Sequence, residues 1–240
     1  DPGLRVLDVM PFSDPVAHAD AIVARLATLP RLPPVAPAGV QAPVLIVPRV
    51  FEPALCQRLI ELYEQHGGQA SGFMRQIDDK TVRINDPDMK RRSDYTISEP
   101  DMREACQARV ARRLIPAIQK AFQFTATRME RYIVARYTGE EVGIFRAHRD
   151  NTTKGTAHRR FAVSLNLNAE DYTGGDLRFP EFGTQCYRPP TGGALVFSCG
   201  LLHEVLPMRA GKRYVFLPFL YDEAAAKIRE ANNMYLADDL

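Results

Sequence analysis

The sequence is poor in cysteine and lacks any long apolar run. Its four cysteines among 240 residues form no C-x-x-C pair and follow no regular spacing, so we expect reduced thiols rather than a disulfide framework or a zinc site. No apolar stretch approaches the roughly 18 residues that a membrane-spanning helix needs, and no basic-then-apolar leader is present. These absences favour a cytoplasmic protein that does not bind a membrane.

A large net charge is also missing. The chain has 31 Lys and Arg against 29 Asp and Glu, a formal net charge of +2, which gives no indication of a nucleic-acid partner. The balance is nevertheless uneven, because residues 75–160 hold 19 basic and 12 acidic residues. This basic middle is either a solvated face or a channel that attracts an anionic cosubstrate or an acidic partner. No pattern in the sequence indicates an oligomeric state.

Prolines concentrate between residues 30 and 53, where seven of the 18 prolines lie. Such a density forces extended backbone and blocks helix interiors and central strands. Residues 30–48 are therefore predicted to be a linker. It separates an N-terminal appendage, residues 1–29, from a main domain over residues 49–240.

The appendage is too short to bury a core by itself. Leu4 to Val9 indicates a short strand, and Asp14 to Leu29 indicates a helix. This order weakly resembles the closing strand and helix of a thioredoxin-like or peroxiredoxin domain. Two interpretations remain open: the appendage packs on the main domain, or it is the tail of a separate upstream domain.

Helical periodicity dominates the first part of the main domain. Glu52 to His66 and Glu99 to Phe122 are predicted to be helices, with a break or bend at Pro116 in the second. Residues 67–98 between them are polar and look loop-rich. A last helix is expected over Glu223 to Ala231.

Beyond Phe122 the apolar residues alternate with the period of two that β-strands show. Glycine and proline turns separate the runs at the spacing of an all-β sandwich or barrel. The fold class is therefore mainly β with flanking helices. The predicted strands are Thr125 to Tyr137, Phe161 to Leu167, Asp176 to Phe179, Ala194 to Ser198, His203 to Leu206 and Arg213 to Leu220.

The chemical signal lies in two of the five histidines. His148 and Asp150 form an H-x-D, and in an extended segment positions i and i+2 point the same way. His203, 53 residues beyond Asp150, lies in a predicted strand and completes a set of two histidines and one carboxylate. Such a set leaves metal positions open and suits iron(II) and dioxygen. An isolated H-x-D is more often a surface hydrogen bond, so the other residues decide its meaning.

Arg213 follows His203 by ten residues, in the strand predicted to run beside that of His203. A buried guanidinium without an acidic neighbour in sequence favours a carboxylate ligand, which its planar fork binds through two hydrogen bonds. A dicarboxylate cosubstrate would supply one. Lys212 is the alternative, but strand alternation turns it to the opposite face.

Over roughly Val47 to Tyr221 the chain resembles iron(II)/2-oxoglutarate-dependent dioxygenases of the prolyl 4-hydroxylase type. The H-x-D, the distant histidine and the arginine at +10 carry this resemblance, in order. Four further segments match the family's pattern: Val50-Phe51-Glu52-Pro53-Ala54-Leu55-Cys56, Phe161-Ala162-Val163-Ser164-Leu165-Asn166-Leu167-Asn168, Gly174-Gly175-Asp176-Leu177-Arg178-Phe179-Pro180 and Gly193-Ala194-Leu195-Val196-Phe197.

The resemblance implies a double-stranded β-helix, a cupin-like jelly roll with helices packed on its major sheet. It implies His148, Asp150 and His203 as iron ligands, and Arg213 as the partner of the 2-oxoglutarate C5 carboxylate. Tyr137 is the candidate for a hydroxyl contact to the cosubstrate.

The resemblance also has departures. The family often has tyrosine where this chain has Phe145, and again where it has Asn166, so contacts to 2-oxoglutarate through those positions are not carried over.

The implied activity is hydroxylation of an unactivated C–H bond with Fe(II), 2-oxoglutarate and O2, with ascorbate as a further reductant. Prolyl residues of a peptide or protein are the first expectation for the substrate. A free amino acid or small metabolite is the alternative within the same chemistry. A non-catalytic, metal-binding cupin-like sensor module is the alternative from another class, and it would not need Arg213.

Overall fold

The computed structural model describes residues 6–29 and 39–237 and divides the chain into two units, Asp1–Gly39 and Val40–Leu240. In the first unit, α1 spans Pro15–Ala27, as the sequence predicts. The strand predicted over Leu4 to Val9 is wrong for residues 6–9, which have no regular structure. A strand without a pairing partner has no ladder hydrogen bonds to hold it. Residues 4 and 5 lie outside the described residues, as do residues 30–38 of the predicted linker.

The linker prediction extends too far toward the C-terminus. Leu45–Val47 forms β1, which pairs antiparallel with β14 (Ala194–Ser198) at the edge of the larger sheet. Pro43 and Pro48 flank this short strand without interrupting it, because proline is tolerated beside and along edge strands. The prolines therefore flank a strand here instead of excluding one.

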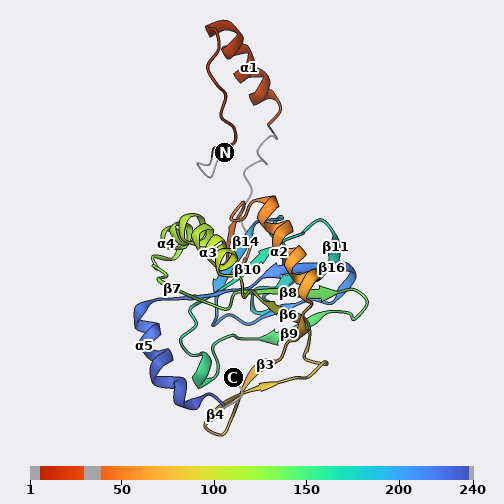
Figure 1. The fold of residues 1–240 in the computed structure, drawn as a ribbon, viewed down its shortest axis with the longest axis vertical. Coiled ribbons are helices and arrows are strands. Elements are labelled where there is room, and N and C mark those ends of the chain that lie inside the picture. Colours follow the sequence, from red (N-terminus) through yellow and green to blue (C-terminus); the bar gives the residue numbers. More distant parts are fainter. Residues whose placement is uncertain (1–5, 30–38, 238–240) are drawn as a thin grey trace. The chain divides into compact units, whose positions relative to one another are not determined.

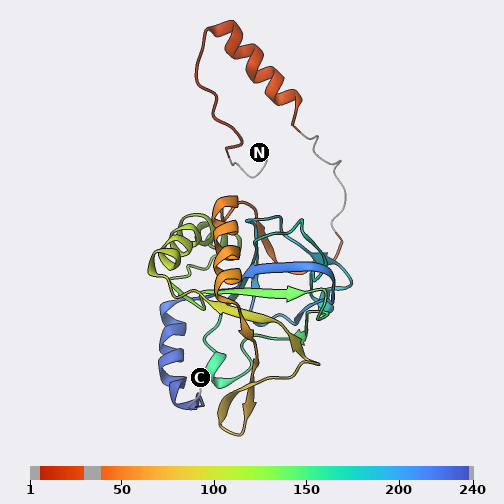
Figure 2. The same ribbon diagram turned by 45° about the vertical axis from the view of Figure 1, so that its right-hand side comes forward.

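Three helical segments cover the outer face of the larger sheet (Figures 1 and 2). Helix α2 spans Pro53–His66, and α3 (Pro100–Arg109) continues into α4 (Ile115–Phe122). A π-helical turn over Val110–Leu114 joins α3 to α4, so the break predicted at Pro116 is a local widening of a continuous helical segment. Proline cannot donate a backbone hydrogen bond, and here the N–H of Ile115 donates to the carbonyl of Val110 instead.

The larger sheet has ten strands, with β1, β14, β10, β16, β8, β6 and β2 side by side in that order. Outside this order, β11 pairs with β16, β17 pairs with β10, and β7 pairs with β17. Its members other than β1 and β14 are β2 (Gln69–Ala70), β6 (Ser93–Thr96), β7 (Arg128–Glu130), β8 (Ile133–Thr138), β10 (Phe161–Asn166), β11 (Tyr172–Gly174), β16 (Met208–Phe216) and β17 (Phe219–Tyr221).

The smaller sheet has five strands in the order β13-β12-β15-β9-β5, and all its pairs are antiparallel. A core of buried residues that includes Phe179, Leu195 and Phe197 packs between the two sheets. Helix α5 (Glu223–Asn232) follows the last strand, as predicted. The strands of this sheet are β5 (Lys90–Arg91), β9 (Ile144–His148), β12 (Leu177–Arg178), β13 (Cys186–Tyr187) and β15 (His203–Val205).

The segment 67–98, expected to be loop-rich, instead contains five strands. Besides β2, β5 and β6, it forms a separate hairpin of β3 (Phe73–Ile77) and β4 (Lys80–Ile84) (Figure 1). Most hairpin residues are exposed or half-buried. A strand that buries neither face leaves no apolar alternation in the sequence.

Strand alternation sorts the residues of the larger sheet between two cores. On β16, Tyr214 and Phe216 pack toward the helices, whereas Val215 faces the smaller sheet. Arg213 has the parity of Val215 and therefore also points between the sheets. The four cysteines are unpaired, and Cys186 alone is exposed. Among the helices of residues 6–29 and 39–237, none is long and apolar enough to cross a bilayer.

Gly192 connects the residues just before α2 to the larger sheet. Its carbonyl accepts hydrogen bonds from the N–H groups of Val50 (2.8 Å) and Phe51 (3.0 Å). Its φ is +74°, and an added Cβ would collide with the Phe51 carbonyl oxygen. Both features favour glycine.

We expect Gly192→Ala to lower the free energy of unfolding by about 2–3 kcal/mol, because it adds backbone strain to a backbone collision. Urea denaturation followed by circular dichroism measures this change. Gly39→Ala is the control, since Gly39 has no positive φ and open space around its Cβ position. Equal effects of the two substitutions would contradict this reading of Gly192.

Candidate metal centre and its cavity

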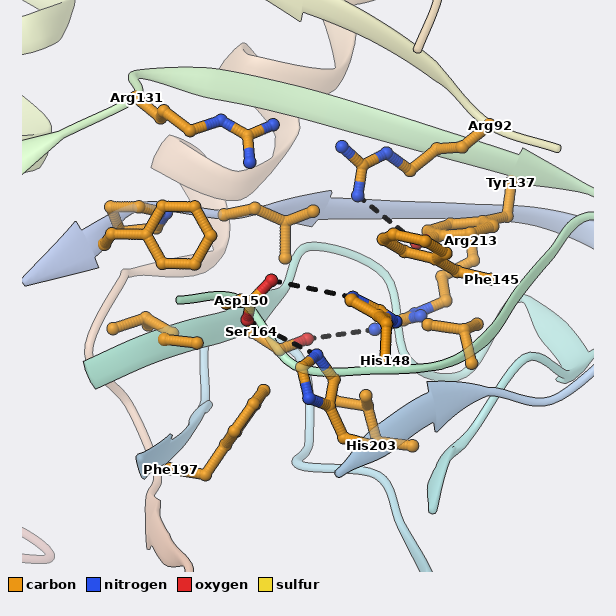
Figure 3. A pocket seen from close by; sticks show the side chains of 17 residues that line it. Arg92, Arg131, Tyr137, Phe145, His148, Asp150, Ser164, Phe197, His203 and Arg213 are labelled. Atoms are coloured by element: carbon orange, nitrogen blue, oxygen red, sulfur yellow. Dashed lines mark hydrogen bonds and ion pairs between the residues drawn. The ribbon is translucent and has the colours of Figure 1, made fainter. Parts of the chain in front are cut away.

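His148, Asp150 and His203 converge where β9 ends and β15 begins, in the middle of the smaller sheet (Figure 3). His148 ends β9 and His203 begins β15, and the two are direct partners in the antiparallel register. Asp150 follows two residues after His148. One ligand-capable atom from each residue lies within 4.8 Å of the others. The structure thus brings together the three residues that the sequence selected.

Both imidazoles are oriented by the backbone. Nδ1 of His148 donates to the carbonyl of Arg146 (2.8 Å), and Nδ1 of His203 donates to the carbonyl of Leu201 (3.0 Å). In the neutral ring this leaves Nε2 as the lone-pair atom. Nε2 of His148 lies 3.5 Å from Asp150 Oδ1, and Nε2 of His203 lies 3.4 Å from Oδ2. Two free nitrogen lone pairs and a carboxylate therefore face a common centre.

Electrostatics set these groups in the protonation states that a metal requires. Burial alone would raise the pKa of Asp150, but the neighbouring His203 and His148 outweigh it and hold the pKa below its usual range. Burial lowers the pKa of His203 to about 4, against the opposing effect of Asp150. At neutral pH the site consequently offers an anionic carboxylate and a neutral imidazole.

Aromatic rings and a salt bridge fix the ligand loop. Phe145 stacks on His148 with ring centroids 3.5 Å apart, and Phe197 packs against His203 at 4.6 Å. Arg149 donates to the carbonyl of Gly200 and to Glu181 (2.7 Å). Arg149, which lies between His148 and Asp150 in the sequence, thus ties the loop that carries them to Gly200, shortly before His203, and to Glu181.

Arg213 lies in the same cavity, deeper between the sheets (Figure 3). Only 3% of its surface is exposed. Nη2 donates to Ser164 Oγ (3.0 Å) and to Asn166 Oδ1 (3.5 Å), whereas Nε and Nη1 are buried without a hydrogen-bond partner. Buried N–H groups of this kind are rare in folded proteins. A carboxylate in the cavity would satisfy them.

Tyr137 faces Arg213 across the β8–β16 register, and the guanidinium lies 5.3 Å from its ring centroid. The Tyr137 hydroxyl accepts a hydrogen bond from Arg92 Nη1 (3.4 Å). Lys212, the alternative to Arg213, is half exposed and lies 3.9 Å from Glu64 of α2, on the opposite face of the sheet. Arg213 and Lys212 therefore point to opposite faces of the larger sheet, as strand alternation predicts.

The two positions that depart from the family pattern have structural roles. Phe145 forms the stack on His148, and Asn166 donates through Nδ2 to the carbonyl of Pro189 (2.7 Å). Sequence reasoning missed three residues that line the cavity: Arg92, Arg131 and Ser164. Ser164 shares a strand with the matched Leu-Asn segment, so parity could have found it. Arg92 lies in the segment expected to be loop-rich. Arg131 lies inside the strand predicted over Thr125 to Tyr137, which the structure divides into β7 and β8 with a φ of 66° at Arg131.

A groove of about 930 Å³ adjoins the cavity and shares Arg131, Phe145, His148 and Asp150 with it. The β3–β4 hairpin, β5, the ligand loop after His148 and the C-terminal residues contribute its walls. A substrate lying in this groove would reach the metal centre from the side of Arg131.

Comparison with known families and proteins agrees with this geometry. Residues 132–221 match the family model of the 2OG-Fe(II) oxygenase superfamily. The procollagen-lysine,2-oxoglutarate 5-dioxygenase 1 of Mus musculus is 27% identical over 182 residues, which cover 71% of this chain. The chain spans 23% of the length of that relative.

Solved structures of low sequence identity share the fold. A prolyl hydroxylase from Trichoplax adhaerens, in complex with a hypoxia inducible factor oxygen degradation domain peptide fragment, aligns with a TM-score of 0.56 at 19% identity, covering 90% of this chain and 92% of that one. A Pseudomonas putida prolyl-4-hydroxylase aligns with a TM-score of 0.53 at 18% identity, covering 85% and 98%. The predicted double-stranded β-helix is confirmed.

We expect His203→Ala to weaken iron(II) binding by more than about 100-fold, because loss of an outer-shell partner alone typically costs 10–100-fold. Anaerobic calorimetric titration measures the affinity. His18→Ala, on α1 and outside the cavity, should leave it unchanged. An unaltered iron affinity in folded His203→Ala protein would show that these residues do not form the metal site.

Proposed function

We propose that this chain, whose residues 132–221 belong to the 2OG-Fe(II) oxygenase superfamily, is an iron(II)- and 2-oxoglutarate-dependent hydroxylase of peptidyl residues. One observation carries the proposal. A cavity holds two oriented imidazoles and a carboxylate together with a buried arginine that has two unsatisfied N–H groups.

His148, Asp150 and His203 are proposed to hold the iron. Their donor set of two imidazole nitrogens and one carboxylate is the type that leaves positions open for oxygen chemistry. When bound, iron with 2-oxoglutarate and dioxygen supplies the oxidant that inserts an oxygen atom into a C–H bond.

Arg213 is proposed to bind the distal carboxylate of 2-oxoglutarate. Its Nε and Nη1 have no partner, and each forms one edge of the guanidinium plane together with Nη2, so a carboxylate can bind along either edge. The hydrogen bond from Nη2 to Ser164 fixes the orientation of the guanidinium plane. The cationic group is thus oriented before the anion arrives, which lowers the entropic cost of binding.

The remaining lining residues exclude water and restrict movement. Phe145, Phe197 and Phe219 enclose the cavity with apolar surface, so the polar interactions inside it act at a lower dielectric constant than in water. The chain contributes position and environment, and the reactive chemistry belongs to the bound groups.

An extended peptide fits the adjoining groove better than a free amino acid does, because the groove runs from the hairpin to the C-terminal residues. Prolyl residues are our first candidate for the target. Lysyl residues are the second, since the mouse relative is named as a procollagen-lysine dioxygenase. A non-catalytic metal-binding module would leave the buried charge of Arg213 without a role.

Mass spectrometry tests the reaction directly. Peptide libraries with central proline or lysine should gain one oxygen in the presence of the protein, iron(II), 2-oxoglutarate and air, with equimolar release of succinate. His148→Ala protein is the control for oxygenation by free iron. Succinate release without an oxygenated product in either library would contradict the peptide assignment.

We expect Arg213→Gln to raise the KM for 2-oxoglutarate by several hundredfold, because removing one partner of a buried charge pair costs about 3–5 kcal/mol. Iron affinity should stay within a few-fold of wild type. Lys212→Gln is the matched control, with the same charge change one residue away on the opposite face. If Lys212→Gln raised the KM and Arg213→Gln did not, the assigned carboxylate partner would be wrong.

Tyr137→Phe tests the proposed hydroxyl contact to the cosubstrate. Loss of one hydrogen bond of about 1 kcal/mol should raise the KM for 2-oxoglutarate about fivefold. The measurement is initial-rate kinetics of succinate formation at saturating peptide. An unchanged KM would mean that the hydroxyl serves only its hydrogen bond with Arg92.

A further inference from the structure

The groove beside the cavity carries an excess of positive charge. Four carboxylates and seven cationic side chains line it. The carboxylates are Asp86, Asp94, Glu130 and Asp150, and the cations are Arg75, Arg83, Lys90, Arg131, Arg149, Arg159 and Arg229. Metal binding would further neutralise Asp150 and enlarge the excess.

Part of this charge is already balanced. Arg159 and Arg229 share Glu130, at 2.7 and 3.4 Å, and Arg149 pairs with Glu181. These arginines brace the ligand loop and α5. The groove's unbalanced charge therefore comes from the other four cations.

Arg75 and Arg83 belong to the β3–β4 hairpin and are exposed. Within residues 6–29 and 39–237, neither has a carboxylate oxygen within 4.0 Å, since the ion pairs of these ranges include neither residue. They form the outer cationic end of the groove.

Lys90 is nearer to the metal centre and is buried. Its Nζ donates to the Gly72 carbonyl (2.6 Å) and to Ser71 Oγ (2.8 Å), and it lies 4.6 Å from the centroid of the Phe145 ring. These partners are neutral. Burial and the charge of Arg92 lower the pKa of Lys90 and so favour its neutral form. The positive charge of the groove therefore comes mainly from the arginines.

Arg131 stands at the junction of groove and cavity and lines both. Figure 3 shows its guanidinium extending over the cavity on the side of Asp150. Its contact with Asp94 is long, 3.5 Å, and Asp94 is held more closely by Arg92, at 2.6 Å. One carboxylate thus serves two arginines, which leaves Arg131 able to bind a second anion.

We propose that the groove binds an extended acidic peptide segment, with Arg131 binding a carboxylate next to the target residue and with Arg75 and Arg83, which the register of the β3–β4 hairpin turns to opposite faces, attracting separate carboxylates farther along. This inference rests on the proposed peptide hydroxylation and specifies its substrate class. The cations select acidic sequence around the target and increase the rate of encounter.

Interspersed carboxylates distinguish this groove from a nucleic-acid channel. Asp86, Asp94 and Glu130 line the groove together with the cations. A single-stranded nucleic acid has a phosphate at every nucleotide and would meet each of them. A peptide can place neutral residues opposite the carboxylates and acidic residues opposite the arginines.

The test compares labelled 12-residue peptides with a central proline flanked by Glu, Gln or Lys. Fluorescence anisotropy with the full chain, iron(II) and 2-oxoglutarate under anaerobic conditions measures binding without turnover. The Glu peptide should bind about tenfold more tightly than the Gln peptide at about 0.05 M salt. This preference should be smaller at about 0.3 M salt, because salt screens the charges.

Substitutions in the groove identify the residues that cause the preference for the Glu peptide. Arg75→Gln/Arg83→Gln should weaken binding of the Glu peptide about fivefold, and Arg131→Gln about tenfold, with little change for the Gln peptide. Arg209→Gln is the matched control, because Arg209 is exposed and lines neither the cavity nor the groove. The hairpin variant removes exposed side chains that have no ion pair within residues 6–29 and 39–237, and so keeps the test valid if Arg131→Gln fails to fold.

Three results would overturn the inference: equal binding of the Glu and Lys peptides, an equal effect of Arg209→Gln, or tighter binding of a 12-nucleotide single-stranded DNA than of the Glu peptide. The proposed function has separate readouts. Oxygenation of Gln-flanked peptides without a Glu preference would refute only the acidic substrate class. Selective binding of the Glu peptide without oxygenation of any library peptide would instead refute the hydroxylase assignment.

Discussion

The pairing of β9 with β15 is the constraint on which the site depends. It sets His203 opposite His148 in the antiparallel register, so both side chains point to one face of the smaller sheet. A shift of one residue in this register would turn His203 to the other face. Backbone hydrogen bonds to the two Nδ1 atoms then direct both Nε2 atoms toward Asp150. The antiparallel strand pair thereby fixes the relative positions of His148 and His203, although they lie 55 positions apart in the sequence.

Short apolar runs bounded by turn residues made much of this arrangement predictable. The segments around Phe161, Ala194 and Arg213 are such runs, and the structure has strands there. Strand parity correctly assigned Arg213 to the inside and Lys212 to the outside. The H-x-D, the distant histidine and the family resemblance together selected His148, Asp150 and His203, and the structure places these three side chains close to one another.

The parts that sequence reasoning missed have a common physical cause. Of the strands in residues 67–98, β2 and β5 lie at sheet edges, and β3 and β4 form a separate hairpin. Thr81 is the one fully buried residue in β2, β3 and β4, so burial has not imposed alternation on these strands. The length of the linker was overestimated because proline was taken to exclude strands, although β1 is an edge strand between two prolines. Arg92 and Arg131 reach the cavity through tertiary contacts that no local pattern encodes.

The cations around the cavity divide the work of recognition by their degree of burial. Arg213 lies deepest, with an orientation fixed by Ser164 and with two unsatisfied N–H groups. A charge buried in this way lowers the stability of the ligand-free protein. It binds an anionic ligand strongly, because folding has already removed water from the charged group. Arg131 is 30% exposed and shares its carboxylate, so it can adapt to a ligand without unfolding its surroundings. Arg75 and Arg83 are exposed, and solvent screening confines them to weak steering of the encounter. Affinity for a small dicarboxylate should therefore reside in the interior, and selectivity for the larger partner should increase along the groove from the hairpin toward Arg131.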